Sequence, residues 1–340
     1  MSPIGTWTVR EANRADDVRL AKLFRVVFQF DRGEAHYQWK FHDNPDGSPV
    51  IAVAEDAGQL VGQYALWPTR LRLGSTAVLG AQSLDTMTHP DYRGQGMFTV
   101  LAERCMQFAA ARGIEALYGF PNEHSHPGFV RKLDWDCTGN IPLWVRPLRP
   151  STHRRLPGWA GPFADVGASF LPKGSRGLFR IEDEPPDNRS LETLLTQWRV
   201  PKGRCRVERT VARYLWRFAE ASGMQYRWVC AYDGDHLASV AVWGTDIRNG
   251  NALLSEVLGQ RPDAIEAVVS TVVRQAMHSR RPILRAASSC MEVRRVLKRT
   301  GFIQHGSLPL IVRKLTPKTL GANVHTHQLW DVFGADLDTF

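Results

Sequence analysis

The sequence of 340 residues contains no apolar run of about 18 residues, which excludes a transmembrane helix. Its first residues, MSPIGTWTVREANRADD, are polar and lack the apolar stretch of a signal peptide. With 43% hydrophobic residues, the chain still has enough apolar side chains for a globular core. We therefore expect a cytoplasmic protein of one large domain or two ordinary ones.

Cysteine is also scarce, and its spacing excludes two kinds of site. The five cysteines are scattered, and no two of them form a Cys-x-x-Cys pair. This pattern argues against a disulfide framework and against a zinc site. Two His-x-His pairs, His124/His126 and His325/His327, have no third ligand at a suitable spacing, so we expect no bound metal.

Positive charge is in excess, because 43 Lys and Arg residues stand against 34 Asp and Glu residues, a formal net charge of +9. Such a surplus favours an acidic partner: nucleic acid, an anionic membrane surface or a phosphate-rich small molecule. The arginines are dispersed, and a nucleic-acid interface would instead cluster them with aromatic residues on one face. The dispersed charge is also typical of an ordinary solvated surface, and it favours a small-molecule partner over nucleic acid, with no membrane involved.

Two segments of the chain are repeated in the same order. The sequence HYQWKF at 36–41 echoes RYLWRF at 213–218, an offset of 177 (213 − 36). The sequence WDCTGNIPLWVRPL at 135–148 echoes FIQHGSLPLIVRKL at 302–315, an offset of 167 (302 − 135). We interpret the chain as a duplicated unit. The predicted parts are a first domain at 1–148, a connector rich in Pro, Gly and Arg at 149–189, a second domain at 190–316, and a tail at 317–340 that packs back through Trp330, Phe333 and Phe340.

Hydrophobic periodicity predicts similar elements in both units. The predicted class is α+β, with mixed, mostly antiparallel sheets flanked by helices. In the first unit we expect helices at 15–27, 96–112 and 126–133 and strands at 50–55, 60–68, 71–73, 77–87, 115–120 and 141–146. In the second we expect helices at 264–278 and 291–300 and strands at 227–232, 236–243 and 283–287, followed by a last strand.

A glycine-rich turn, Arg93-Gly94-Gln95-Gly96, lies between a predicted strand and a predicted helix. The start of a helix presents unpaired N–H groups that suit phosphate, and glycine lets the backbone approach closely. No Gly-Lys-Ser/Thr follows, so the turn is not a P-loop, and the GxGxxG dinucleotide fingerprint is missing as well. A plain surface turn is the alternative.

The turn resembles the acetyl-CoA loop of the GNAT superfamily of N-acyltransferases, with Phe98 in place of the usual Gly or Ala at the last position. Downstream, ALYGFPNEHSHPGFVRKLDW is similar to the closing part of that family, with Asn122 and Lys132 at matching positions. The second unit has no corresponding Arg-Gly pair between Glu256 and Ala267. The resemblance implies a tandem GNAT protein with one working cofactor site and one degenerate half.

The resemblance also implies a co-substrate, acetyl-CoA or another short acyl-CoA. Its pantetheine arm would pair with the backbone of Met87 and Thr88, and Asn122 would line the far side of the opening. Its pyrophosphate would lie on the glycine turn, formed by Arg93, Gly94, Gln95, Gly96 and Met97, with Phe98 beside it.

The acceptor amine must lose a proton before it attacks, so a base is required. Glu123, His124 and His126 follow a strand end beside the expected acyl group, and His126 is slightly favoured because Pro127 and Gly128 follow it. Asp85 could orient the amine or act as the base, or it could form a structural salt bridge. The EHSHP segment could alternatively only cap a short helix. Tyr118 is a weak candidate for the acid that protonates the leaving thiolate.

Two functions follow from these observations. The first is an acyl-CoA-dependent N-acyltransferase acting on a primary amine of a small molecule, an amino sugar or nucleotide-linked amino sugar by resemblance. The second is a non-catalytic protein that senses CoA or binds nucleic acid on the same fold. The sequence leaves the acyl length, the acceptor and the oligomeric state open.

Overall fold

A computed structural model describes residues 6–152, 157, 160–175, 177–198, 201, 203–245, 250–279, 281–316 and 329–337. The chain divides into two compact units. The first unit consists of residues 1–139 with 309–327, and the second consists of residues 140–308 with 328–340. Each unit is described separately below.

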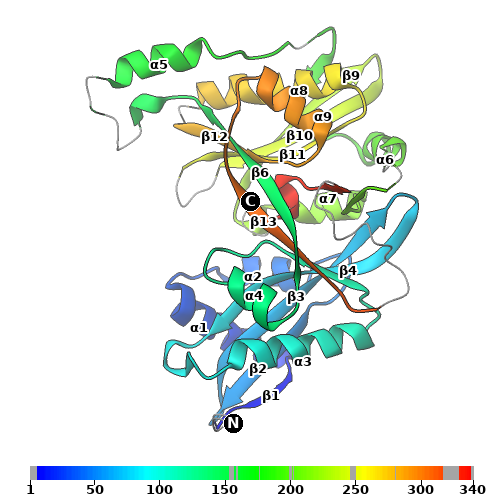
Figure 1. Cartoon of the computed structure of the whole chain (residues 1–340). Helices are drawn as coiled ribbons and strands as arrows, with labels where there is room; N and C mark the ends of the chain where they lie inside the picture. The colour runs from blue at the N-terminus through cyan, green and yellow to red at the C-terminus, as the bar shows by residue number, and fades with distance from the viewer. Residues whose placement is uncertain are drawn as a thin grey trace. The chain divides into compact units, whose positions relative to one another are not determined.

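The sheet of the first unit lies in the lower part of Figure 1. Among its described pairs of neighbouring strands, one is parallel. That pair is β4 and β5, and the other pairs are antiparallel. The strand order is β1 (Thr8–Glu11), β2 (Val50–Asp56), β3 (Gln59–Leu73), β4 (Thr76–Thr88), β5 (Ala116–Gly119) and the C-terminal end of β13 (Ile303–Lys314).

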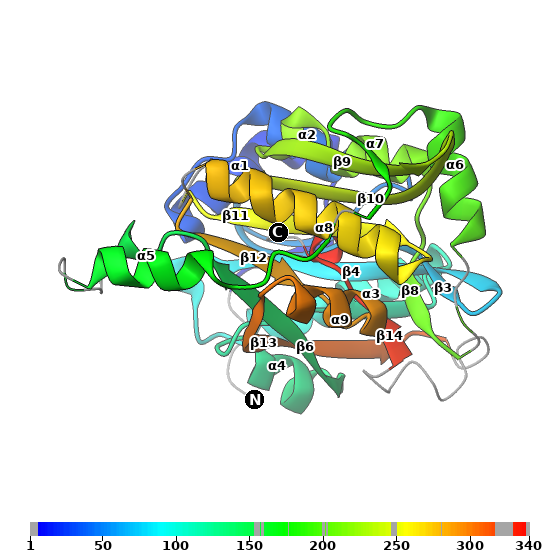
Figure 2. The same cartoon turned by 90° about the horizontal axis from the view of Figure 1, so that it is seen from above.

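Helices cover both faces of this sheet. Helix α3 (Met97–Ala111) packs against β2 and β3, because Met97, Leu101 and Cys105 recur every four residues and form one buried face. Helices α1 (Asp17–Phe28) and α2 (Glu34–Phe41) lie on the opposite face (Figure 2). There the Trp39 ring of α2 lies 6.1 Å from the Trp67 ring of β3. The short helix α4 (His126–Lys132) follows β5.

The second unit repeats this strand order, and its parallel pair is β11 with β12. The order is β7 (Arg180–Glu182), β9 (Gln225–Asp233), β10 (His236–Thr245), β11 (Ala252–Gly259), β12 (Ile283–Ala287) and β6 (Asp136–Pro147). Its helices are α5 (Gly161–Ser169), α6 (Asn188–Gln197), α7 (Val211–Arg217), α8 (Pro262–His278) and α9 (Met291–Arg299). Two short strands, β8 (Cys205–Val207) and β14 (Trp330–Asp331), pair in parallel.

The last strand of each half lies in the sheet of the other half. Strand β6, from the end of the predicted first domain, pairs with β12 through residues 143–147. Strand β13, from the end of the predicted second domain, pairs with β5 through Ile311–Lys314. The structural units therefore differ from the predicted boundaries at 148 and 316. In the tail, Trp330 and Phe333 are buried, and Phe340 lies outside the described residues.

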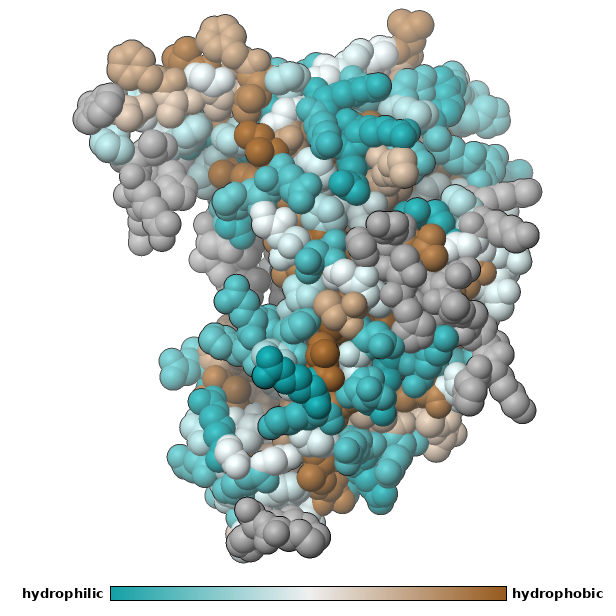
Figure 3. Space-filling model, in the orientation of Figure 1, coloured by the Kyte–Doolittle hydropathy of each residue, from teal (hydrophilic) through white to brown (hydrophobic). Residues whose placement is uncertain are grey.

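Helix α5 carries apolar side chains that are not covered within the described part of the chain. Phe163 is 76% exposed and Val166 is 57% exposed, and Phe170, directly after the helix, is 81% exposed. Helix α5 is labelled at the upper left of Figure 1, and Figure 3 shows hydrophobic surface in that region. Among the described residues, no helix is long and apolar enough to cross a membrane.

Candidate active site in the first unit

The glycine turn is an open loop between β4 and α3. A short 3-10 turn, Pro90–Tyr92, leads into it, and helix α3 begins at Met97. Gly94 has a φ of +80° and Gly96 has a φ of +76°. A Cβ built on either residue would meet no atom within 4 Å. Glycine is therefore required here by the left-handed backbone and not by lack of space.

The N–H groups of this loop are available to a ligand. Among the described residues, no acceptor is found for the backbone N–H groups of residues 94–98. The first bonded amide is that of Thr99, which donates to the Gly96 carbonyl at 3.1 Å. The side chain of Arg93 is exposed and has no ion pair within the described part of the chain. Free amides and a nearby guanidinium at the start of a 15-residue helix form an anion site.

Two contacts hold the loop in place. The indole N–H of Trp7 donates to Gln95 Oε1 at 3.1 Å, and the Tyr92 hydroxyl donates to Asp56 Oδ2 at 2.7 Å. The hydrogen bond to Asp56 raises the pKa of Tyr92. The ring of Phe98 points away from the loop, because it packs edge-on against Phe129 of α4 at 5.2 Å. The Phe98 side chain, which belongs to α3, therefore packs against α4. Its contribution to the anion site is its backbone N–H.

Beside the loop, one edge of β4 has no partner strand among the described residues. Pairing between β4 and β5 ends at Ser83 and Gly119, whereas β4 continues to Thr88. On its other side β4 stays paired with β3, with an irregularity between the pairs Ala65–Leu84 and Gln63–Met87. The free edge of residues 84–88 can therefore pair with an extended ligand whose phosphate end lies on the glycine turn.

Asn122 and its neighbours form the turn that starts α4. Asn122 Oδ1 accepts hydrogen bonds from the backbone N–H groups of His124 at 3.0 Å and Ser125 at 2.9 Å. Glu123 and His124 are exposed, and His126 is half-buried at the first position of α4. These bonds close a turn just before α4, whose N-cap residue Ser125 makes no side-chain capping hydrogen bond within the described part of the chain, so the base role of this segment stays a prediction. The side chains of Glu123, His124 and His126 have no recorded partner among the described residues.

Asp85 forms a salt bridge, which is one of the three roles that the sequence left open for it. Its carboxylate is 5% exposed and lies 2.9 Å from Arg32 Nη2 and 3.0 Å from Lys40 Nζ. Burial opposes ionisation, but the two cations outweigh it and hold the pKa of Asp85 well below its usual range. A carboxylate held in this way is a poor proton acceptor, so we correct the expectation that Asp85 is a candidate base.

A cavity of about 510 Å³ lies beside Asp85, between helices α1 and α2 and the strands β3 and β4. Two buried polar atoms at its wall, the Tyr37 hydroxyl and Gln63 Oε1, have no hydrogen-bond partner among the described residues. Burial, with the carboxylates of Asp17 and Asp85 nearby, raises the pKa of Tyr37 far above its usual value. Asp85 and Met87 of β4 both line this cavity, so it adjoins the strand whose other edge is free.

The same cavity contains a histidine–carboxylate pair that sequence reasoning missed. His42 Nε2 lies 2.6 Å from Asp17 Oδ2, and both residues line the cavity. A carboxylate on one ring nitrogen fixes the orientation of the imidazole and leaves the other nitrogen for chemistry. The repeated segment HYQWKF ends directly before His42, and it is the one sequence signal that pointed to this part of the chain.

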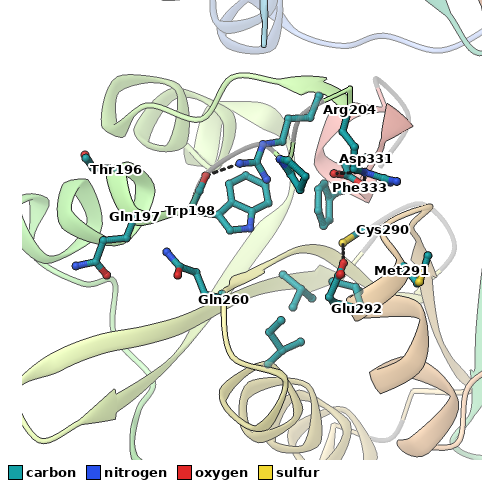
Figure 4. Close-up of a pocket in the computed structure, with 16 residues that line it drawn as sticks. Thr196, Gln197, Trp198, Arg204, Gln260, Cys290, Met291, Glu292, Asp331 and Phe333 are labelled. Carbon is teal, nitrogen blue, oxygen red and sulfur yellow. Dashed lines mark hydrogen bonds and ion pairs between the residues drawn. The ribbon is translucent and has the colours of Figure 1, made fainter. Parts of the chain in front are cut away.

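The second unit has a cavity of about 580 Å³ beyond the paired part of β11 and β12, which is lined at one side by the end of β11 and the start of α9 (Figure 4). Its walls include Trp198, Arg204, Gln260, Glu292 and Asp331. The helix that follows, α8, begins with Pro262, and its Ala264 N–H is bound by Asp263 Oδ1 at 2.9 Å. This helix start therefore offers fewer open amides than the glycine turn, because Pro262 has no N–H and that of Ala264 is already bound.

Comparisons with known proteins agree with this geometry. Residues 8–138 match the model of the acetyltransferase (GNAT) domain family. No curated protein matches the sequence. The predicted α+β GNAT fold is confirmed by solved structures that resemble most of the chain.

Three such structures illustrate the likeness. A GCN5-related N-acetyltransferase from Anabaena variabilis has a TM-score of 0.66 and 14% identity, covering 91% of this chain and 73% of its own. A protein of unknown function from Enterococcus faecalis, described as a probable N-acyltransferase, has a TM-score of 0.69 and 10% identity over the same shares. A GCN5-related N-acetyltransferase from Kribbella flavida has a TM-score of 0.61 and 13% identity, covering 91% and 71%. At these identities the likeness is one of fold.

Proposed function

We propose that the chain is an N-acyltransferase that moves an acetyl or other short acyl group from CoA to a primary amine of a small molecule. One observation carries the proposal: an open anion loop adjoins a free strand edge, and a cavity with unpaired polar groups lies against the same strand. A thioester is attacked by the neutral amine, and CoA leaves as the thiolate.

The residues of the first unit divide into two groups. The amides of residues 94–98, with Arg93, would hold the pyrophosphate, and the backbone of Met87 and Thr88 would pair with the pantetheine arm. Asn122 already uses Oδ1 to accept two backbone hydrogen bonds in its own turn, which leaves its amide nitrogen for the ligand. The second unit, whose corresponding helix begins with Pro262 and has no Arg-Gly pair before it, would bind no cofactor.

The acceptor would enter the cavity beside Asp85. We infer from the sequence resemblance that it is an amino sugar or a nucleotide-linked amino sugar. Its polar groups would satisfy the Tyr37 hydroxyl and Gln63 Oε1, which are buried without partners among the described residues.

Two imidazoles are candidates for the base that takes the amine proton. His126 begins α4, the helix that follows the end of β5. His42 lies in the acceptor cavity and is oriented by Asp17. With Asp85 held in its ion pair, an imidazole is the group best suited to accept a proton near neutral pH.

The test is release of free thiol from acetyl-CoA in the presence of a panel of amines, with product mass measured in parallel. The matched variant is Gly96→Val, which strains the left-handed position where a Cβ would meet no protein atom. We expect acylated product with the natural protein and little with the variant. CoA binding without transfer to any amine would instead favour a CoA-sensing protein.

A further inference from the structure

The repeated segment carries more than its aromatic residues. With the offset of 177 residues between HYQWKF and RYLWRF, the residue matching Arg32 is Arg209, and the one matching Lys40 is Arg217. Tyr37 likewise matches Tyr214. Each half therefore places an arginine, a tyrosine and a second cation at the same spacing. The helix that carries these residues or follows the arginine is α2 in the first unit and α7 in the second.

The two halves use the arginine of this set in the same way. In the first unit Arg32 pairs with Asp85 beside the irregularity of β4. In the second unit Arg209 Nε pairs with Glu256 Oε2 at 2.7 Å, beside the irregularity of β11. Because β4 and β11 hold the same place in the two sheet orders, the two ion pairs are structural counterparts.

In the second unit the chain itself occupies this site. Asp336, 2% exposed, places its carboxylate 2.6 Å from Arg209 Nη1. The carbonyls of Ala335 and Leu337 accept hydrogen bonds from Arg217 at 2.9 and 3.0 Å. Arg209 thus binds two carboxylates, Glu256 from the sheet and Asp336 from the tail, and burial raises the pKa of Glu256 to about 7.

In the first unit the corresponding arginine faces a cavity. Arg32 lines it and is 17% exposed at its side chain, and its contacts with Asp85 use Nη1 and Nη2. A guanidinium has five N–H donors, so donors remain beyond those given to one carboxylate. The Tyr37 hydroxyl lines the same cavity without a partner among the described residues.

We propose that this cavity binds an amine acceptor that carries a carboxylate, with Arg32 and Tyr37 contacting that carboxylate as Arg209 contacts Asp336. The proposal rests on the proposed function, because it assigns the cavity to the acceptor. It narrows the acceptor from any small amine to an amino acid, a peptide or an acidic amino sugar. Arg32 would act here as a specificity residue, distinct from the base.

The experiment uses acceptors that differ in the carboxylate. The pairs are muramic acid with glucosamine, and L-lysine with L-lysinamide. A hydrogen bond to a charged group typically contributes enough for about a tenfold to hundredfold preference in kcat/KM for the acid of each pair. Arg32→Gln should remove that preference mainly through KM, and Tyr37→Phe should reduce it without removing the Arg32–Asp85 pair.

Arg104→Gln is the control and should keep the preference, because Arg104 is an exposed arginine of α3 that does not line the cavity. Binding of muramic acid to the natural protein and to each variant is measured by calorimetry without acetyl-CoA. Equal kcat/KM for acid and neutral acceptors, or equal losses for both in Arg32→Gln, would overturn the carboxylate proposal while acyl transfer stands. Muramic acid binding that depends on Arg32, with no acyl transfer, would support the site and refute the enzyme. No binding and no transfer would refute both.

Discussion

Replacing Asp85 by Asn tests whether this residue has a structural role or a catalytic one. The change keeps the shape of the side chain but removes the charge shared by Arg32 and Lys40. Breaking a buried ion pair from one side typically costs about 3–5 kcal/mol, because the remaining charge stays buried. The exposed fractions are small, 2% for Lys40 and 5% for Asp85, so we expect a value within that range.

The loss of stability in Asp85→Asn should be confined to the first unit. Hydrogen–deuterium exchange followed by mass spectrometry reports local opening, so faster exchange is expected in α2 and β4 and unchanged exchange in α8 and β10. Asp91→Asn is the control, because the Asp91 side chain is 82% exposed. It should leave the exchange of both units unchanged.

The effect should also depend on pH, with a sign that follows from the lowered pKa of Asp85. A carboxyl whose pKa is lower in the folded state stabilises the fold above its unfolded pKa of about 3.9 and loses that contribution as the pH falls. Natural protein and Asp85→Asn should therefore differ most near pH 7 and converge below about pH 4. A large fall in kcat with unchanged exchange at pH 7 would refute the structural role and restore Asp85 as a candidate base.

Three further predictions concern the ligand sites. Arg93→Glu should weaken CoA binding by at least tenfold in calorimetry, because it places a negative charge beside the pyrophosphate; unchanged affinity would locate the site elsewhere. Titration should give one CoA per chain, and a value of two would contradict a cofactor-free second unit. Replacing the base should lower kcat by about 10²–10⁴ with CoA affinity intact, so His126→Ala and His42→Ala are compared directly. Near-natural turnover in both variants, and in His124→Ala, would eliminate an imidazole base.

The sequence predicted those helices and strands whose hydrophobic residues recur with a regular period. The helix at 96–112 is observed at Met97–Ala111, and the strand at 77–87 is observed at Thr76–Thr88. Both have clear periodicity and a glycine turn between them. Helix α2 was not predicted, because Trp39, Lys40 and Phe41 are buried in succession and leave no amphipathic period.

The ion pair of Asp85 could not be predicted from spacing. Its partner Arg32 lies 53 residues earlier in the chain and its partner Lys40 lies 45 residues earlier (85 − 40). Lysine is also a residue type rarely found buried. Only the fold brings α2 against β4. The contact between His42 and Asp17 could not be predicted from spacing either, because the two residues belong to different helical segments and meet at the cavity wall.

The exchange of β6 and β13 between the two sheets could not be predicted from the sequence for a different reason. The two strands echo each other in sequence, with Gly139 and Pro142 matching Gly306 and Pro309. Either strand therefore satisfies the hydrophobic pattern of either sheet edge. A repeat reveals that two strands are equivalent, but it does not reveal which sheet each one joins.

That exchange determines when the sheet of the first unit can be completed while the chain is being synthesised. The edge of β5 receives its neighbour only when residues 311–314 have left the ribosome, about 195 residues after β5 itself (311 − 116). Until then β5 is an open edge of the kind that recruits other strands. Strand β6 is the nearest substitute in the nascent chain, since it matches β13. A gene fragment ending near residue 148 would therefore encode a half that closes on its own β6, a pairing that the full-length chain has exchanged for β13.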